Sequence, residues 1–158
     1  MTKRRVMFIA STGGHLEELL QLKSMFDNYD YSLITEKTKS NMYLKDVYKK
    51  RVHYLIYGTK HHFLTYPFKL LTNCFISLGY YLRYRPDYII TTGVHTAGPM
   101  CCLGKIFGSK VIYIETFANM VTKTSTGRLI YPISDKFIVQ WESMKKIYPK
   151  ADFGGWIF

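Results

Sequence analysis

Short apolar runs alternate with helix-like segments along most of the chain. Strand-like runs occupy residues 5–10, 31–35, 52–57, 88–92, 110–114 and 135–141. Between them, apolar spacings of three and four residues predict a helix over residues 14–26, and small residues predict another over 97–107. This alternation is typical of a mostly parallel sheet covered on both faces. With 158 residues, the chain is therefore predicted to form one α/β domain, residues 1–158, around a doubly wound sheet.

The turn after the first strand is rich in glycine. It reads Ser11-Thr12-Gly13-Gly14-His15 and leads directly into the first predicted helix. Glycines let a backbone approach a ligand without a Cβ clash, and the first amides of a helix lack internal partners. That combination favours an anion such as phosphate. The alternative is a turn that only reverses the chain, and the pattern leaves both open.

Two later segments also follow predicted strands. They read Gly93-Val94-His95-Thr96-Ala97-Gly98-Pro99 and Glu115-Thr116-Phe117-Ala118-Asn119. In a doubly wound sheet, ligands bind outside the carboxyl ends of the strands. We therefore expect both segments to lie beside the first glycine turn.

The positive charge of the chain favours acidic partners. The net charge is +11, with Lys and Arg spread from Lys3 to Lys150, which suits a folded surface facing nucleic acid, anionic lipid or a phosphorylated substrate. No nucleic-acid recognition motif is present, so a basic nucleic-acid-binding domain stays only as an alternative. Cys74, Cys101 and Cys102 do not form a disulfide framework, and reduced thiols are expected.

Residues 60–85 form an aromatic, apolar segment with basic ends. Only thirteen residues separate Lys69 from Arg83, whereas a bilayer span needs about twenty. One interpretation is an amphipathic helix at an anionic membrane surface, and the other is a crossover helix packed on the sheet. The candidate membrane-surface residues are Lys60, Phe63, Phe68, Lys69, Phe75, Tyr80, Tyr81, Arg83 and Arg85.

Familiar catalytic and cofactor motifs are not found. The sequence contains neither a Gly-x-x-x-x-Gly-Lys-Ser/Thr loop nor Gly-x-Gly-x-x-Gly nor Gly-x-Ser-x-Gly. His61 and His62 have no carboxylate or cysteine at ligand spacing, so we predict no metal site and no cofactor. Adjacent Glu17 and Glu18 point to different helix faces and are expected to be solvated or helix-N-terminal charges rather than a paired acid and base. The apolar end, residues 153–158, predicts either a buried strand or a partner surface, with Trp156, Ile157 and Phe158 as interface candidates.

Taken together, the three turns resemble a known family. Their order and spacing are similar to the acceptor half of GT-B glycosyltransferases, with Ser11-Thr12-Gly13-Gly14-His15-Leu16 as the most specific part. The chain resembles the membrane-associated subunit of split enzymes: bacterial capsule and exopolysaccharide subunits, and the anchoring subunit of the eukaryotic dolichol-linked UDP-GlcNAc transferase. It also looks like the N-terminal domain of the single-chain peptidoglycan N-acetylglucosaminyltransferase. The resemblance covers nearly the whole chain.

This resemblance implies a Rossmann-like domain equivalent to the N-terminal half of a GT-B enzyme. It would bind a polyprenyl-diphosphate-linked sugar acceptor, dock a separate donor-binding subunit that carries the UDP-sugar site, and sit peripherally on the cytoplasmic face of the cell membrane. His15 becomes the candidate base, and the alternative is a residue that only forms hydrogen bonds at the helix start. The single-chain relatives have a histidine-glutamate pair after the fifth strand, of which only Glu115 matches here, next to Thr116. The candidate diphosphate-binding residues are Ser11, Thr12, Gly13, Gly14, Gly93, His95, Thr96 and Gly98.

A complete GT-B enzyme needs two such domains, and this chain is expected to supply one. The sequence therefore predicts an accessory glycosyltransferase subunit that needs a catalytic partner, without a nucleic-acid partner. A self-sufficient nucleotide-sugar enzyme is the remaining alternative, disfavoured by the length of the chain.

Overall fold

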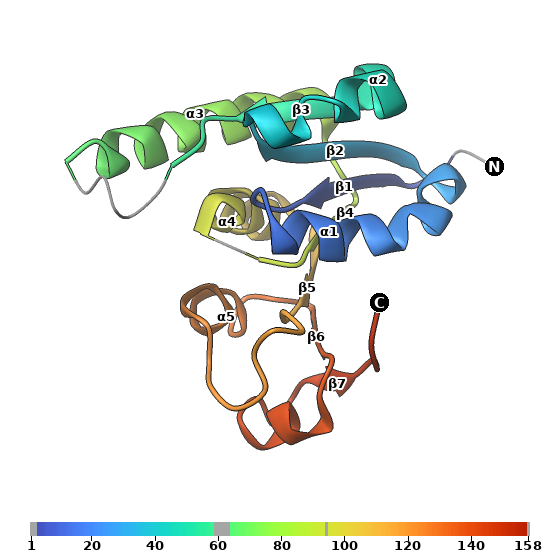
Figure 1. The fold of residues 1–158 in the computed structure, drawn as a ribbon, viewed down its shortest axis with the longest axis vertical. Helices are drawn as coiled ribbons and strands as arrows, with labels where there is room; N and C mark the ends of the chain where they lie inside the picture. The colour runs from blue at the N-terminus through green and yellow to red at the C-terminus, as the bar shows by residue number, and fades with distance from the viewer. Residues whose placement is uncertain (1–2, 59–63, 94, 158) are drawn as a thin grey trace.

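A seven-stranded, wholly parallel sheet runs through the molecule. The computed structural model describes residues 3–58, 64–93 and 95–157. The strand order is β3-β2-β1-β4-β5-β6-β7, and every neighbouring pair is parallel (Figure 1). The predicted α/β, doubly wound class is confirmed. The strands are β1 (Arg5–Ile9), β2 (Asp30–Glu36), β3 (Val52–Leu55), β4 (Tyr88–Thr91), β5 (Lys110–Ile114), β6 (Lys136–Val139) and β7 (Asp152–Phe153).

Helical segments connect successive strands. The first predicted helix is α-helical only as far as Leu20 and continues as a 3₁₀ helix to Asn28. The α-helices are α1 (Gly14–Leu20), α2 (Leu44–Tyr48), α3 (Tyr66–Tyr84), α4 (Gly98–Phe107) and α5 (Ser125–Ile130). The 3₁₀ helices are η1 (Gln21–Asn28), η2 (Lys39–Asn41), η3 (Lys49–Arg51), η4 (His95–Ala97) and η5 (Glu142–Lys146).

Two hydrophobic cores cover the two faces of the sheet. Alternate residues of a strand point to opposite faces, so Phe8 of β1 packs with Leu19 and Phe26 of α1 and η1. Its neighbour Ile9 belongs to the other core, together with Met100 of α4. Strands buried on both faces explain why β1 and β5 are almost wholly apolar.

The strand order reverses between β1 and β4. The chain builds β1, β2 and β3 in one direction, returns through α3, and then builds β4 to β7 in the other. The loops after the neighbouring strands β1 and β4 therefore lead to opposite faces of the sheet. Doubly wound sheets bind ligands in the crevice between two such loops. This topology places the glycine turn of residues 11–15 directly beside the segment of residues 92–99.

The crossover helix α3 buries two polar side chains and exposes several apolar ones. It buries Asn73 and Ser77 against the rest of the molecule, whereas Phe68 and Phe75 on its outer face are 73% and 67% exposed. Its N-terminal part projects past the carboxyl ends of the central strands (Figure 1). Both interpretations of this segment thus have a physical basis, since α3 is a packed crossover helix with an exposed apolar face. Within the described part of the chain, no helix combines the length and the hydropathy required for a membrane span.

The predicted membrane-surface residues divide between the two faces of α3. Tyr81 is only 5% exposed and its hydroxyl lies 2.6 Å from Ser109 Oγ, so its assignment to the membrane surface is corrected. Tyr80 faces the sheet and donates to the Tyr54 carbonyl oxygen at 3.2 Å. Arg83 and Arg85 are exposed and Lys69 is half-buried, while Lys60 and Phe63 lie outside the described residues.

Candidate functional site

His15 and Thr92 join the two loops on either side of the strand reversal. His15 Nδ1 lies 2.8 Å from the Thr92 carbonyl oxygen, and the Thr92 hydroxyl donates to the His15 carbonyl oxygen at 2.6 Å. Beside them, Gly93 has φ 107°, and a Cβ there would lie 3.1 Å from the Tyr113 hydroxyl and 3.5 Å from His15 Nδ1. Glycine is required at Gly93 by both the backbone and the close approach.

This contact sets the tautomer of the imidazole. A carbonyl oxygen only accepts, so Nδ1 of His15 carries the hydrogen and donates to Thr92, which leaves the lone pair of a neutral ring on Nε2. Glu18, one helical turn further on, has Oε2 3.9 Å from Nδ1. Its charge would stabilise an imidazolium formed when Nε2 takes up a proton. His15 thus has the orientation and the charged neighbour of a general base.

The glycine turn leaves part of its backbone open. Gly13 has φ 80° and ψ −147°, a conformation reserved for glycine, and its carbonyl oxygen accepts from the amides of Leu16 and Glu17. The amides of Gly14 and His15 donate to no residue in the described ranges. A Cβ built on Gly13 or Gly14 would meet nothing within 4 Å. This surface can therefore accept a ligand that approaches the backbone closely.

A buried carboxylate ties three loops together behind the glycine turn. Glu36, at the end of β2, is 3% exposed and accepts from the Thr12 amide at 3.3 Å and from the Thr96 hydroxyl at 3.0 Å. Asn41 donates to the Glu36 carbonyl oxygen at 2.6 Å. The loops after β1, β2 and β4 are therefore held as one unit, and the charge of Glu36 is met by protein donors.

A second buried carboxylate organises the segment after β5. Glu115 Oε2 accepts from the Tyr148 hydroxyl at 2.9 Å, and Thr124 Oγ1 donates to both carboxylate oxygens at 3.0 and 3.1 Å. Burial raises the pKa of Glu115 above its usual range, while these hydrogen bonds act in the opposite direction. Burial also raises the pKa of nearby Tyr113, and the charge of Glu115 adds to that increase. Glu115 therefore acts as a structural anchor at the edge of the site.

Not every predicted site residue can touch a ligand. Ser11, Gly93, Thr96 and Gly98 are buried, and the Thr96 hydroxyl is engaged by Glu36, so these residues hold the loops. Thr12, Gly13, Gly14 and His15 are partly or fully exposed. His95 begins η4, and its side chain lies outside the described part of the structure.

The expectation for Glu18 is corrected, and Glu36 was missed. Glu18 is 3% exposed, and its Oε1 accepts from the Thr116 hydroxyl and the Phe117 amide, both at 2.8 Å, so it is not a solvated charge. These contacts bring the third predicted segment to the glycine turn, as expected. Glu36 directly follows the apolar run 31–35, and this position at a strand end could have marked it as a site residue. It was missed because it also begins a basic, polar stretch that was interpreted as exposed surface.

The C-terminal residues form an exposed aromatic cluster. Trp156 is 59% exposed, and its ring centroid lies 4.9 Å from that of Trp141 and 5.3 Å from that of Phe117. Ile157 is half-buried, and its amide donates to Gln140 at 3.2 Å. The preceding β7 is a short, exposed edge strand, and Phe158 lies outside the described residues.

Comparison with known proteins identifies the family. The family described as "Oligosaccharide biosynthesis protein Alg14 like" matches residues 6–157. The chain belongs to this Alg14-like family. The UDP-N-acetylglucosamine transferase subunit ALG14 of Homo sapiens is 27% identical over 175 residues, covering 95% of this chain and 81% of that protein. Its counterpart in Schizosaccharomyces pombe is 26% identical over 178 residues, covering 97% and 83%. The expected likeness to the subunit of the eukaryotic transferase, and thus to a glycosyltransferase subunit, is confirmed.

Solved structures support the fold of this Alg14-like chain. MurG of Acinetobacter baumannii superposes with a TM-score of 0.72 at 20% identity, over 89% of this chain and 42% of that one. UDP-N-acetylglucosamine 2-epimerase of Rickettsia bellii gives 0.75 at 15% identity, over 98% and 45%. The chain thus spans less than half of each. The predicted Rossmann-like fold, resembling the N-terminal half of a GT-B protein, is confirmed.

Proposed function

We propose that the chain is the acceptor-binding, membrane-recruiting subunit of a two-component glycosyltransferase. The complete enzyme transfers a sugar from a UDP-sugar to a polyprenyl-diphosphate-linked sugar in polysaccharide biosynthesis, such as that of a capsule or exopolysaccharide. A separate chain binds the donor. Membership of the Alg14-like family supports this role, because curated relatives matched over more than 80% of their length are named as transferase subunits.

The observation that carries the proposal is the open glycine turn at the strand reversal. Gly13 and Gly14 present an unobstructed backbone, and the amides of Gly14 and His15 are without acceptors among the described residues. A diphosphate carries negative charge that these amides and the start of α1 can meet. The Glu36 network holds the turn from behind and exposes no free carboxylate to the ligand.

His15 supplies the proton acceptor in this proposal. The acceptor sugar hydroxyl gives its proton to Nε2 of His15 as its oxygen attacks the anomeric carbon of the donor sugar. The bond between that carbon and the UDP oxygen breaks, and UDP leaves with the electron pair. Nδ1 stays bonded to the Thr92 carbonyl oxygen, and Glu18 stabilises the imidazolium. Thr116 contacts Glu18 and so lies near the acceptor, while Glu115 fixes the same loop.

The outer face of α3 serves as the membrane-surface element of the proposal. Phe68 and Phe75 present apolar rings, and Lys69, Arg83 and Arg85 add positive charge for anionic headgroups. The N-terminal part of α3 overhangs the edge of the sheet that carries the glycine turn (Figure 1). A peripheral position on the cytoplasmic face of the membrane would bring a lipid-linked acceptor to that edge.

The aromatic C-terminal cluster is the proposed contact with the donor-binding subunit. Trp156 is exposed beside Phe117, which follows β5 at the same edge as the glycine turn. Exposed aromatic side chains are enriched at protein interfaces. A partner bound to Trp156, Ile157 and Phe158 would be placed next to the acceptor site.

Transferase activity in a reconstituted system tests the proposal. The chain is purified alone and after co-expression with a candidate donor-binding GT-B domain, and each sample is given labelled UDP-N-acetylglucosamine with a polyprenyl-diphosphate-linked sugar. We expect label in the lipid only when both chains are present. Full activity of the purified chain by itself would refute the subunit assignment. Absence of transfer to any polyprenyl-diphosphate acceptor in the complex would refute the acceptor role.

A further inference from the structure

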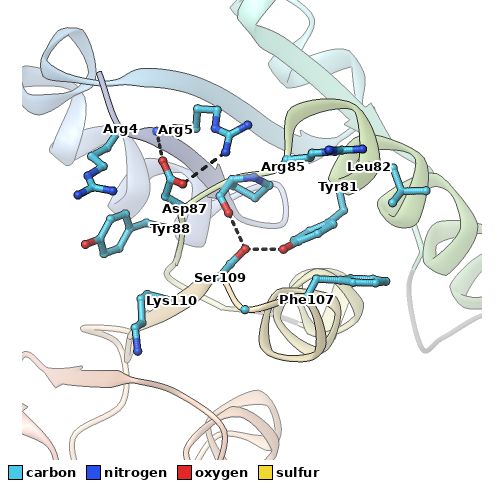
Figure 2. A pocket seen from close by; sticks show the side chains of 12 residues that line it. Arg4, Arg5, Tyr81, Leu82, Arg85, Asp87, Tyr88, Phe107, Ser109 and Lys110 are labelled. Atoms are coloured by element: carbon cyan, nitrogen blue, oxygen red, sulfur yellow. Dashed lines mark hydrogen bonds and ion pairs between the residues drawn. The ribbon is translucent and has the colours of Figure 1, made fainter. Parts of the chain in front are cut away.

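A cavity lies at the edge of the sheet opposite the glycine turn. It has a volume of about 610 Å³ and is bounded by the amino ends of β1, β4 and β5 and by the C-terminal ends of α3 and α4 (Figure 2). None of the residues assigned to the acceptor site lines it. The cavity is therefore a separate feature of the fold.

Positive charge dominates the wall of this cavity. Arg4, Arg5, Arg85 and Lys110 line it, against the single carboxylate of Asp87. Asp87 is already engaged, because its two oxygens accept from the Arg5 amide at 2.9 Å and from the Arg5 guanidinium at 3.5 Å (Figure 2).

Two guanidinium groups are left for a ligand. Lys110 Nζ lies 3.2 Å from Asp135 Oδ1, outside the cavity. No ion pair or side-chain hydrogen bond joins Arg4 or Arg85 to a described residue. A backbone hydrogen bond lowers the pKa of Asp87, and the charge of Arg4 adds to this effect. Figure 2 shows them on opposite sides of the cavity, one before β1 and one at the end of α3. The C-termini of α3 and α4 add partial negative charge here, which the arginines outweigh.

Arg85 occupies a position that normally takes glycine. It ends α3 with φ 42° and ψ 62°, the left-handed conformation that glycine adopts at helix ends without strain. Helix α4 ends beside it at Gly108, with φ 88° and ψ 10°. The left-handed conformation carries backbone strain at an arginine, and the residue that bears this strain lines the cavity.

An apolar wall completes the cavity. Leu82 and Phe107 are exposed on one side, and Leu82 continues the outer row of Phe68 and Phe75 along α3. A ligand that combines a phosphate group with an adjoining apolar part therefore matches both walls. Arginine pairs bind phosphate oxygens through charge-assisted hydrogen bonds.

We propose that this cavity is a phosphate-binding site in which Arg4 and Arg85 contact the phosphate oxygens. The phosphate comes either from the headgroup of an anionic phospholipid lying against α3 or from a small soluble phosphate. The lipid source rests on the membrane association proposed above. The phosphate site itself does not depend on it, nor on the acceptor site at the other edge.

The decisive variant is Arg85→Gly. It removes a cation while relieving the left-handed strain, so the protein keeps or gains thermal stability. The matched control is Lys49→Gly, because Lys49 has φ 52°, carries the same charge and does not line the cavity. Arg4→Gln tests the other guanidinium. Binding is measured by flotation with phosphatidylcholine vesicles, with and without phosphatidylglycerol, and by calorimetric titration with inorganic phosphate and glycerol 3-phosphate.

We expect Arg85→Gly and Arg4→Gln each to weaken binding about fivefold, as for one lost cation at an anionic surface, while Lys49→Gly stays within about twofold. Loss confined to phosphatidylglycerol vesicles, in Arg4→Gln as well as in Arg85→Gly, identifies the lipid headgroup as the source, because Arg4 lines the cavity but lies outside the α3 membrane element. Loss confined to the soluble phosphates identifies a small ligand, and both results uphold the site. Equal effects of Arg85→Gly and Lys49→Gly in every assay overturn it. Phe75→Ser separates the proposals: if it loses vesicle binding while Arg85→Gly keeps the binding of both vesicles and soluble phosphates, the phosphate site is refuted and membrane association stays intact.

Discussion

His15 and Thr92 exchange two hydrogen bonds across a sequence separation of 77 residues. The imidazole Nδ1 meets the Thr92 carbonyl oxygen at 2.8 Å, and the Thr92 hydroxyl meets the His15 carbonyl oxygen at 2.6 Å. Each residue thereby fixes the loop of the other, and the ring is oriented with Nε2 away from the contact. One side chain thus links the fold to the proposed chemistry.

Replacement of His15 by asparagine separates these two roles. An asparagine amide can donate to the Thr92 carbonyl oxygen as Nδ1 does, but it offers no base at the position of Nε2. We expect His15→Asn to keep the unfolding midpoint close to that of the wild type and to lower kcat of the reconstituted complex by about 10²–10⁴-fold. His15→Ala should lose stability as well. If the asparagine variant retains wild-type kcat, His15 serves only to hold the loop.

The two glycines of the turn should respond differently to alanine. Gly13 has a backbone conformation that only glycine adopts readily, so Gly13→Ala should destabilise the protein by about 1–3 kcal/mol. Gly14 begins α1 with open space beyond its Cα, so Gly14→Ala should leave the free energy of unfolding unchanged within about 0.5 kcal/mol. The added methyl group would instead obstruct the ligand and raise KM for the lipid acceptor. Urea titrations and acceptor-dependent kinetics measure the two effects, and an unchanged KM in Gly14→Ala would place the acceptor elsewhere.

Alternation of apolar runs predicted the sheet well, but it could not predict the type of every helix. The spacing of three residues between Leu22 and Met25 suits both an α-helix and a 3₁₀ helix. The change at Gln21 is therefore not visible in the pattern. The burial of two polar residues of α3 was equally hidden, because Asn73 and Ser77 gain their burial from contacts made only in the folded chain.

The sequence predicted the parts of the site that lie in local motifs at strand ends. It did not predict the residues whose burial depends on contacts with distant parts of the chain. The glycine turn and the segments after β4 and β5 converge because the parallel topology requires it. Glu18 is buried by Thr116, which lies 98 residues away, and Glu36 by Thr96, which lies 60 residues away. A local sequence pattern does not encode such pairings, so both carboxylates looked like ordinary surface charges.

Thr96 is expected to matter for stability through Glu36. Thr96→Val removes the hydroxyl that donates to Glu36 Oε1 and leaves a buried carboxylate oxygen without that partner. A hydrogen bond to a charged group contributes about 1.5–3 kcal/mol, so the free energy of unfolding should fall by that amount. Thr72→Val is the matched control, because the Thr72 hydroxyl donates to the Phe68 carbonyl oxygen on an exposed helix face. Urea denaturation of both variants checks this, and equal losses would show that the Glu36 contact adds nothing.

Glu115 predicts a specific pH dependence of stability. Its pKa is raised in the folded protein, mainly by burial, whereas an unfolded glutamate titrates near about 4.3. Between these two values the folded state binds more protons than the unfolded state, so this group's contribution to stability falls as pH rises through the window. Above the folded pKa the contribution is constant.

Glu115→Gln removes that titration while keeping an amide that can bond Thr124 and Tyr148. Urea midpoints are measured at several pH values from about 4 upward, and the difference between wild type and variant isolates the carboxyl group from other titrations. The wild type should lose stability relative to Glu115→Gln as pH increases. Parallel curves would mean that the pKa of Glu115 is not raised.

Gly127 should tolerate no side chain because it packs on the Glu115 cluster. A Cβ at Gly127 would lie 2.4 Å from both Glu115 Oε2 and the Tyr148 hydroxyl, so Gly127→Ala must displace buried groups that bond one another. Overpacking of this kind costs about 1–3 kcal/mol. Gly79, on α3, has nothing within 4 Å of a built Cβ, and alanine there should stabilise the helix by about 0.5–1 kcal/mol. Opposite shifts of the thermal midpoint in the two variants would confirm the packing, while a neutral Gly127→Ala would show that the segment after β5 adapts freely.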